Sequence, residues 1–372
     1  MLDKQETKIT IGMAAYNAAA FIRYAIESVL KQTHSNFELI IYNDGSTDDT
    51  ALIISGYKDE RIKFIDASQN RGVSIARQIT KEKATGEWLT WLDADDIFLP
   101  RRLEKMLDHA WNSGADIVSD KYEVIDVDGK LLNKQLEAPD YLTQDENFTR
   151  LFERNRMLPH PLISKHCFQT VDYDTRLSTS EDYDYWLKCV YRGFRFSKIS
   201  DVLLHYRIVP GSLSSDNMRS RTFTKIILSK YEVPDIIRLY QERGHSEGCI
   251  NYMATLQYLF RDEKSKALEF AKKGWMDDDF VSRDFYLGTL LLYDGQYQTA
   301  ERILKRHLDA SPNSPAGWNN FGVLKYLQGE ECMFFFKKAV QLFSGYEDAN
   351  INLSSAQTKR ITFTQLSENR LR

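Results

Sequence analysis

Residues 9–48 of the chain read ITIGMAAYNAAAFIRYAIESVLKQTHSNFELIIYNDGSTD, an apolar run, a helical pattern and a second apolar run in close succession. The same alternation continues to about Ser119. Nearly continuous apolar strands separated by helices predict a parallel sheet covered on both faces, whose ligands bind beyond the carboxyl ends of the strands. The predicted strands are 9–16, 37–42, 61–66, 87–93 and 115–120, and the helical patterns lie at 18–31, 48–57, 73–83 and 100–111.

Length and composition limit the classes of protein to consider. The 372 residues exceed the usual size of one domain, so we expect two. A net charge of -4 gives no general attraction to nucleic acid. No apolar segment has the length of a signal peptide or a transmembrane span, which predicts a cytoplasmic protein and leaves peripheral membrane contact open. The cysteines are far apart and without a CxxC pair, so we expect them to be reduced and buried: Cys167, Cys189, Cys249 and Cys332.

The segment Trp91-Leu92-Asp93-Ala94-Asp95-Asp96 places a DxD triplet where the fourth predicted strand ends. Carboxylates two residues apart at a strand end can both approach a hard divalent cation, which prefers oxygen ligands and neutralises a departing diphosphate. The alternative is an acidic turn in which Asp95 or Asp96 caps the helix that begins near Pro100.

A second acidic turn, residues 42–48, follows another predicted strand and faces the same crevice. Asp44 is suited to accept a hydrogen bond from a nucleobase, and Gly45 allows a close approach of the backbone. Residues 46–49 also have the composition of a helix N-cap, and the two roles are compatible.

The ordered motifs in residues 8–50, NRGVSIARQ (70–78) and EWLTWLDADD (87–96) resemble the family 2 inverting glycosyltransferases, over about residues 8–215. The resemblance implies the GT-A fold, a doubly wound, Rossmann-like mixed sheet. It also implies a nucleotide pocket after the first strand, with Asp44 at the base, Arg77 near the nucleotide and Asp93 at the ribose or sugar. The nucleotide-sugar-binding residues so implied are Ala15, Tyr16, Asn17, Asp44, Arg77, Asp93 and Ala94, and the metal residue is Asp95.

An inverting transfer needs a base that takes the proton of the acceptor hydroxyl. The family carries this base in an ED pair that opens a helix, and Ser180 to Lys188 (SEDYDYWLK) resemble that motif. We assign the base to Asp182, with Glu181 as the alternative base or as a contact to acceptor hydroxyls. Without the other motifs, the same acids are an ordinary acidic first turn, favoured by the helix dipole.

The sequence departs from the family at two positions. Ala14 stands where a proline commonly precedes the nucleotide pocket, and Val209 stands at the histidine position of the element that resembles YRxHxxS. Val209 leaves open how the metal is held, and strand geometry makes His205 an unlikely replacement. Further candidates for diphosphate or acceptor contacts are Arg207, Ser212, Ser214 and His160, the last of which equally fits a structural role in its loop.

The last third of the chain contains an internal repeat. Gly288 and Gly322 are 34 residues apart, as are Gly295 and Gly329, which is the tetratricopeptide period. Trp318 to Gly322 resemble the opening of that repeat, and the alternative is a plain helical extension. The predicted organisation is a GT-A domain at 1–215, a helical linker at 216–249, tetratricopeptide-like repeats at 250–357 and a tail at 358–372.

Together these features predict an inverting transferase. It moves a hexose or N-acetylhexosamine, most simply from a UDP-sugar, to a glycan or protein acceptor, with Mg²⁺ or Mn²⁺ as cofactor. The repeats then bind the acceptor or another protein, since stacked helix pairs present extended binding surfaces. The rival hypothesis is a non-catalytic repeat scaffold with a domain that binds nucleotide-sugar.

Overall fold

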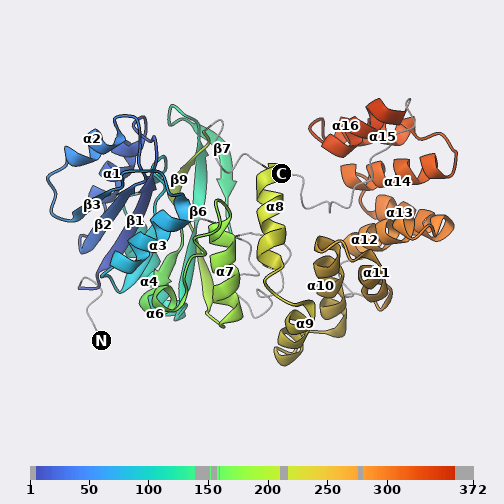
Figure 1. Cartoon of the computed structure of the whole chain (residues 1–372), viewed down its shortest axis with the longest axis horizontal. Coiled ribbons are helices and arrows are strands. Elements are labelled where there is room, and N and C mark those ends of the chain that lie inside the picture. Colours follow the sequence, from blue (N-terminus) through green and yellow to red (C-terminus); the bar gives the residue numbers. More distant parts are fainter. Residues whose placement is uncertain are drawn as a thin grey trace. The chain divides into compact units, whose positions relative to one another are not determined.

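The computed structural model divides into two compact units, Met1–Ile227 and Leu228–Arg372. The helices and strands of each unit are shown in Figure 1. The structure describes residues 6–138, 151, 157–158, 160–209, 217–274 and 280–356, without the side chains of 217–221 and 280–282. The sequence also predicts a helix near residues 147–154, which falls almost wholly outside these ranges.

The N-terminal unit is built on one mixed sheet in the order β3-β2-β1-β4-β8-β6-β9-β5, with β7 beside β6. Strands β1 to β4 are parallel, β8 is antiparallel to β4 and β6, and β9 runs parallel to β6. The doubly wound mixed sheet expected from the sequence is therefore confirmed. The strands are β1 (Ile9–Ala15), β2 (Phe37–Asn43), β3 (Ile62–Asp66), β4 (Trp88–Trp91), β5 (Ile97–Phe98), β6 (Ile117–Ile125), β7 (Leu131–Leu136), β8 (Leu162–Ser164) and β9 (Phe196–Arg207).

Helices cover both faces of this sheet. The apolar stripes of α1 and α4 pack into one buried cluster with Ile11 of β1 and Leu39 of β2. On the other face, α3 packs against β1 near Gly12. The helices of this unit are α1 (Ile22–Leu30), α2 (Thr50–Ser55), α3 (Val73–Lys83), α4 (Arg102–Ser113), α6 (Lys165–Thr170) and α7 (Glu181–Tyr191).

Gly12 permits the contact between β1, β4 and α3. A Cβ atom at this position would lie 2.6 Å from Cε3 of Trp91 and 2.9 Å from Cγ2 of Thr80. We expect Gly12→Ala to lower the free energy of unfolding by about 1–3 kcal/mol, because overpacking displaces buried side chains. Urea denaturation measures this, with Gly56→Ala as the control, since Gly56 has the ordinary φ of −69°. Equal stability of the two variants would contradict the packing argument.

The C-terminal unit is helical throughout its described residues, as expected. Successive helices pair as α10 with α11, α12 with α13 and α14 with α15, and each pair also contacts the next. The helices from residue 217 onward are α8 (Asn217–Leu228), which crosses the unit boundary, α9 (Val233–Glu242), α10 (Glu247–Phe260), α11 (Lys264–Lys272), α12 (Phe280–Tyr293), α13 (Tyr297–Ala310), α14 (Pro315–Leu327), α15 (Met333–Leu342) and α16 (Glu347–Ser355).

The glycines 34 residues apart occupy equivalent places in successive helix pairs. A Cβ atom at Gly288 would lie 2.7 Å from Leu304 of the paired helix, and one at Gly322 would lie 2.7 Å from Phe336. Gly295 and Gly329 both have positive φ after the first helix of their pairs. The sequence period thus has a packing counterpart, while the tetratricopeptide assignment stays a prediction.

Candidate active site

Three loops meet at the carboxyl edge of the parallel strands, after β1, β2 and β4. The register pairs Ala15 with Asn43 across β1 and β2, and the Asp44 amide donates to the Ala15 carbonyl at 2.8 Å. β4 lies on the other side of β1, and the Leu92 amide donates to the Gly12 carbonyl at 3.0 Å. The acidic turns predicted to share a crevice therefore follow strands on either side of β1.

The loop after β1 is held by the loop after β2. Asn17, at φ 48°, accepts the Thr47 amide on Oδ1 at 2.8 Å, and its own amide donates to Ser46 Oγ at 2.9 Å. Ala15 is buried, whereas the Tyr16 side chain is half exposed. Of the three residues predicted to line the nucleotide pocket, Tyr16 offers a ring face to a ligand, and Asn17 braces the loop.

Asp44 is buried and holds the loop that leads into α3. Its two carboxylate oxygens accept the backbone amides of Arg71 and Gly72, each at 2.8 Å. Gly45, at φ 69°, lies so close to the Gln69–Asn70 backbone that a Cβ would sit 2.6 Å from the Asn70 nitrogen. The structure thus gives Asp44 a bracing role, and its contact with a nucleobase stays a prediction.

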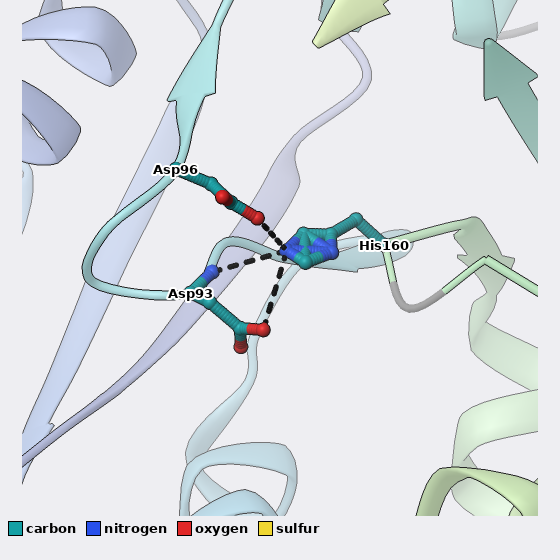
Figure 2. Close-up of side chains that lie close together, drawn as sticks. All are labelled: Asp93, Asp96 and His160. Carbon is teal, nitrogen blue, oxygen red and sulfur yellow. Dashed lines mark hydrogen bonds and ion pairs between the residues drawn. The ribbon is translucent and has the colours of Figure 1, made fainter. Parts of the chain in front are cut away.

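The DxD turn meets a histidine from a distant part of the chain. His160 Nε2 lies 3.1 Å from Asp96 Oδ2 and 3.6 Å from Asp93 Oδ2, and it accepts the Asp93 backbone amide at 3.2 Å (Figure 2). His160 and Asp96 are buried, whereas the Asp93 side chain is 38% exposed. The structure therefore places His160 beneath the turn rather than on an exposed acceptor-side loop.

His160 is fixed in this place by buried groups on two strands, β4 and β6, and on helix α4. Its carbonyl accepts Thr90 Oγ1 at 3.1 Å and also the Arg102 guanidinium, and its amide donates to the Tyr122 hydroxyl at 3.0 Å. Arg102 forms a two-pronged ion pair with Asp120, at 2.8 and 3.1 Å, in which both side chains are fully buried. The imidazole is thus held rigidly against the turn.

The carboxylates of the DxD turn lie close enough together for their negative charges to repel one another. Burial, with the neighbouring Asp93 charge, raises the pKa of Asp95 to about 6. Burial, with Asp95 and Asp93, raises the pKa of Asp96 well above its usual range, and burial lowers the pKa of His160, which favours the neutral imidazole. A bound cation would relieve this repulsion.

The donor atoms at the turn fit a divalent cation. One oxygen each of Asp93 and Asp96 and one ring nitrogen of His160 all lie within 4.8 Å of one another. Among the residues that the structure describes, none donates a hydrogen bond to the buried Asp96 Oδ2. Carboxylate oxygens suit Mg²⁺ and Mn²⁺, and an imidazole nitrogen is a common ligand of transition metals. This cluster does not include Asp95, which the sequence predicts as the metal residue. The turn therefore offers one set of ligands that contains Asp96 and His160 and an overlapping set that contains Asp95.

These pKa shifts predict how stability depends on pH. Because the folded pKa of Asp95 lies above its unfolded value, its contribution to stability is present below about pH 4 and is lost as the pH rises through about 6. We therefore expect Tm to fall more between pH 5 and pH 8 in the wild type than in Asp95→Asn, a comparison in which the opposite effect of the lowered His160 pKa cancels. We also expect a larger rise in Tm on adding Mg²⁺ near pH 8, where protons no longer compete for the carboxylates. Differential scanning fluorimetry measures both effects. Asp95→Asn should reduce both, and equal Mg²⁺ effects at the two pH values would contradict the cation fit.

Arg77 connects the DxD turn to the helix that carries the ED pair. Its guanidinium lies 3.3 Å from Asp93 Oδ1 and 3.1 Å from Glu181 Oε1. Burial favours the neutral form of Arg77, but Glu181 and Asp93 outweigh it and raise the Arg77 pKa above its usual value. Burial, partly offset by Arg77, raises the pKa of Glu181 to about 7. Arg77, predicted near the nucleotide, is in this structure an ion-pair bridge.

The ED pair opens α7 as predicted, and its two acids have different surroundings. Glu181 is 6% exposed and is engaged by Arg77, whereas Asp182 is half-buried and accepts the Tyr183 amide on Oδ1 at 2.7 Å. The side chains of Trp186 and Leu187 are buried in the core, as the alternative interpretation of this motif also requires. Asp182 is therefore the more accessible carboxylate of the two.

Comparisons with known proteins identify the family to which this chain belongs. The model of the family described as glycosyl transferase family 2 matches residues 10–171. An uncharacterised glycosyltransferase of Methanocaldococcus jannaschii is 32% identical over 230 residues, which cover 60% of this chain and 77% of that protein. The chain belongs to the family 2 glycosyltransferases.

Two further comparisons bear on the transferase. The Escherichia coli protein named UDP-Glc:alpha-D-GlcNAc-diphosphoundecaprenol beta-1,3-glucosyltransferase WfgD is 27% identical over 242 residues, covering 62% of this chain and 89% of that one. The crystal structure of S. aureus TarS 1-349 in complex with UDP-GlcNAc aligns with a TM-score of 0.53 at 15% identity, over 97% of this chain and 98% of that chain. The second likeness concerns the fold, which is GT-A.

Among the described parts of the transferase, no helix combines the length and apolar character needed to cross a bilayer.

The remaining predicted residues of the transferase lie at the end of β9 or beyond it. The Arg207 side chain is buried and donates to the carbonyls of Asp95, Asp126 and Val127, while its amide donates to Asp96 Oδ1 at 2.8 Å. In this conformation Arg207 braces the DxD turn, and its contact with diphosphate stays a prediction. Ser212 and Ser214 fall outside the described residues.

Sequence reasoning missed three parts of this site: the contact of His160 with Asp96, the Arg102–Asp120 pair beneath it, and the Arg77 bridge. Arg102 carried a signal, because a charged residue within the apolar stripe of a predicted helix requires a buried partner. His160 was a candidate for acceptor contacts or for a structural role, but no signal in the sequence linked it to Asp96. His205, left out of the site, lies opposite Ile97 in the register of β5 and β9, and its imidazole lies 3.6 Å from Glu123 on the neighbouring strand.

Proposed function

We propose that this transferase moves a hexose or N-acetylhexosamine from a UDP-sugar to a hydroxyl group of a glycan or protein acceptor, with inversion at the anomeric carbon. The observation that carries the proposal is the Arg77 bridge, at 3.3 Å to Asp93 and 3.1 Å to Glu181. Through Arg77, the DxD turn and α7, the helix that bears the proposed base, lie close together. The UDP-Glc donor in the name of WfgD and the UDP-GlcNAc bound in the TarS structure support a UDP-linked donor.

Asp182 is the proposed base. As the acceptor oxygen forms its bond to the anomeric carbon, Asp182 takes the hydroxyl proton, and the bond from that carbon to the diphosphate oxygen breaks with release of UDP. Glu181 is less suited to this role, because Arg77 occupies its carboxylate. Its raised pKa also leaves it partly protonated at neutral pH.

A divalent cation, Mg²⁺ or Mn²⁺, fits the DxD turn and would neutralise the charge that develops on the departing diphosphate. Asp95 and Asp93 would hold it at the exposed side of the turn, with Asp96 and His160 available beneath. Tyr16 would lie against the nucleotide. Arg77 and His160 keep the turn in place, because each contacts Asp93 directly.

The helical unit is proposed to bind the acceptor or a second protein of glycan assembly, as tetratricopeptide-like arrays do. The repeated helix pairs support this role, and the alpha-D-GlcNAc-diphosphoundecaprenol acceptor in the name of WfgD supports a glycan acceptor. We also keep the expectation of a cytoplasmic enzyme, peripheral at the membrane.

Donor turnover tests the proposal. The full chain is incubated with a panel of UDP-sugars and GDP-sugars, with and without Mn²⁺, and released nucleoside diphosphate is measured. We expect metal-dependent release from one or a few UDP-sugars by the wild type, and its loss in Asp95→Ala. If no donor is turned over and none is bound in a metal-dependent way, the scaffold hypothesis replaces the transferase.

A further inference from the structure

One face of α3 carries a row of polar side chains, of which the proposed reaction has used Arg77 alone. Ser74, Arg77, Gln78 and Lys81 recur at the spacing of one helix face. Ser74, Arg77 and Lys81 are buried, and Gln78 is half-buried. Buried polar groups need partners, so this face must be paired with something.

The partner is the segment of residues 168–180, which leads into α7 and is called the approach segment here. Ser74 Oγ donates to the Leu177 carbonyl. Gln78 accepts the Tyr173 amide at 2.9 Å and donates to Asp172 Oδ1 at 3.0 Å. The approach segment is therefore fastened to α3 at several points before α7 begins.

Lys81 makes the densest of these contacts. Its Nζ donates to the carbonyls of Phe168 and Val171, at 2.9 and 3.0 Å, and to Asp172 Oδ1 at 2.7 Å. These acceptors use all three N–H groups of the ammonium, which is what a buried charge requires. The Asp172 side chain is 71% exposed, and Lys81 with Gln78 lowers its pKa. A charge held in this way fixes the positions of its acceptors.

The same helix face contacts both parts of the proposed site. Arg77, which shares this face with Ser74 and Gln78, contacts Asp93 of the DxD turn and Glu181 of α7. We propose that this face of α3 sets the distance between the DxD turn and the first turn of α7, with Lys81 and Gln78 as positioning residues that act through the approach segment. Neither residue touches the reacting atoms. The inference rests on the proposed transfer reaction.

Steady-state kinetics of Lys81→Met and Asp172→Ala test the inference. We expect kcat to fall by about 10–100-fold, because misplacement of a base by a fraction of an ångström to one ångström costs this much. KM for the UDP-sugar should remain at the wild-type value, because the donor side keeps its contacts. Asp172→Asn keeps the Oδ1 acceptor and should restore most of the rate. Lys165→Met is the matched control, because Lys165 pairs with Glu87 at 2.7 Å near the surface.

Trypsin cleavage after Arg176 gives a second measurement that needs no activity. The Arg176 side chain is 84% exposed within the approach segment. We expect faster cleavage there in Lys81→Met and Asp172→Ala than in the wild type and in Lys165→Met. If Lys81→Met does not fold, Asp172→Ala decides the question, since its exposed side chain leaves the core intact.

The inference is overturned if kcat or the cleavage rate of these variants equals that of Lys165→Met, or if KM for the donor rises in step with the fall in kcat. Absence of turnover in the wild type would instead refute the proposed function. The cleavage rates would then still decide whether Lys81 fastens the approach segment.

Discussion

Asp182→Asn is expected to lower kcat by about a thousandfold, within the range that general-base catalysis contributes. Asparagine has nearly the shape of aspartate, and its side-chain oxygen can still accept the Tyr183 amide, but it cannot take up the acceptor proton. Affinity for the UDP-sugar should remain, because Asp182 lies on the helix across from the DxD turn. Single-turnover transfer and calorimetric donor binding measure the two quantities.

Glu181→Gln and Asp201→Asn serve as comparisons for this prediction. Glu181→Gln removes the charge that pairs with Arg77, so it should weaken transfer less than Asp182→Asn. Asp201 pairs with Lys105 at the surface, and its replacement should leave kcat unchanged. If Asp182→Asn transfers at the wild-type rate while Glu181→Gln does not, Glu181 is the base.

Arg102→Met is expected to lower the free energy of unfolding by about 3–5 kcal/mol, because it leaves the Asp120 carboxylate buried without its ion-pair partner. Both side chains of this pair are fully buried. The same substitution removes a donor from the His160 carbonyl and so loosens the brace beneath the DxD turn. Urea denaturation of the full chain measures the loss.

The neighbouring arginine supplies the control. Arg101 pairs with Glu104 at the surface, with 60% of its side chain exposed, so Arg101→Met should cost less than about 1 kcal/mol. The double variant Arg102→Met/Asp120→Leu should recover part of the loss, because an apolar pair needs no charge compensation. Equal losses at Arg101 and Arg102 would contradict the account of the buried pair.

The sequence predicted the parts of the fold in which neighbours along the chain are neighbours in space. The alternation of apolar runs and helical patterns up to Ser119 corresponds to β1 through the start of β6. Motifs at strand ends located the acidic turns, since parallel strands bring their carboxyl ends to one edge. The insertion of β8 between β4 and β6, and the pairing of β6 with β9, join segments far apart in sequence and carry no periodic signal.

The roles of the predicted site residues stay predictions, and the structure adds contacts that their motifs did not indicate. Asp93 and His160 are 67 residues apart, and only the folded chain shows that an imidazole lies against the DxD turn. Arg77 was assigned to the nucleotide by resemblance, and its two carboxylate partners come from different motifs. Such contacts depend on loop geometry, which composition and spacing do not determine.

Because Gly288 and Gly322 pack in equivalent ways, a whole repeat can be removed from the helical unit, whereas no such segment can be removed from the transferase unit. Cutting the chain at one glycine and rejoining it at the other removes 34 residues, yet it leaves a glycine facing the next helix at the junction. The number of helix pairs can therefore change by whole repeats while each remaining pair keeps its neighbours. The mixed sheet allows no such excision, because its active site draws on strands from both ends of the unit.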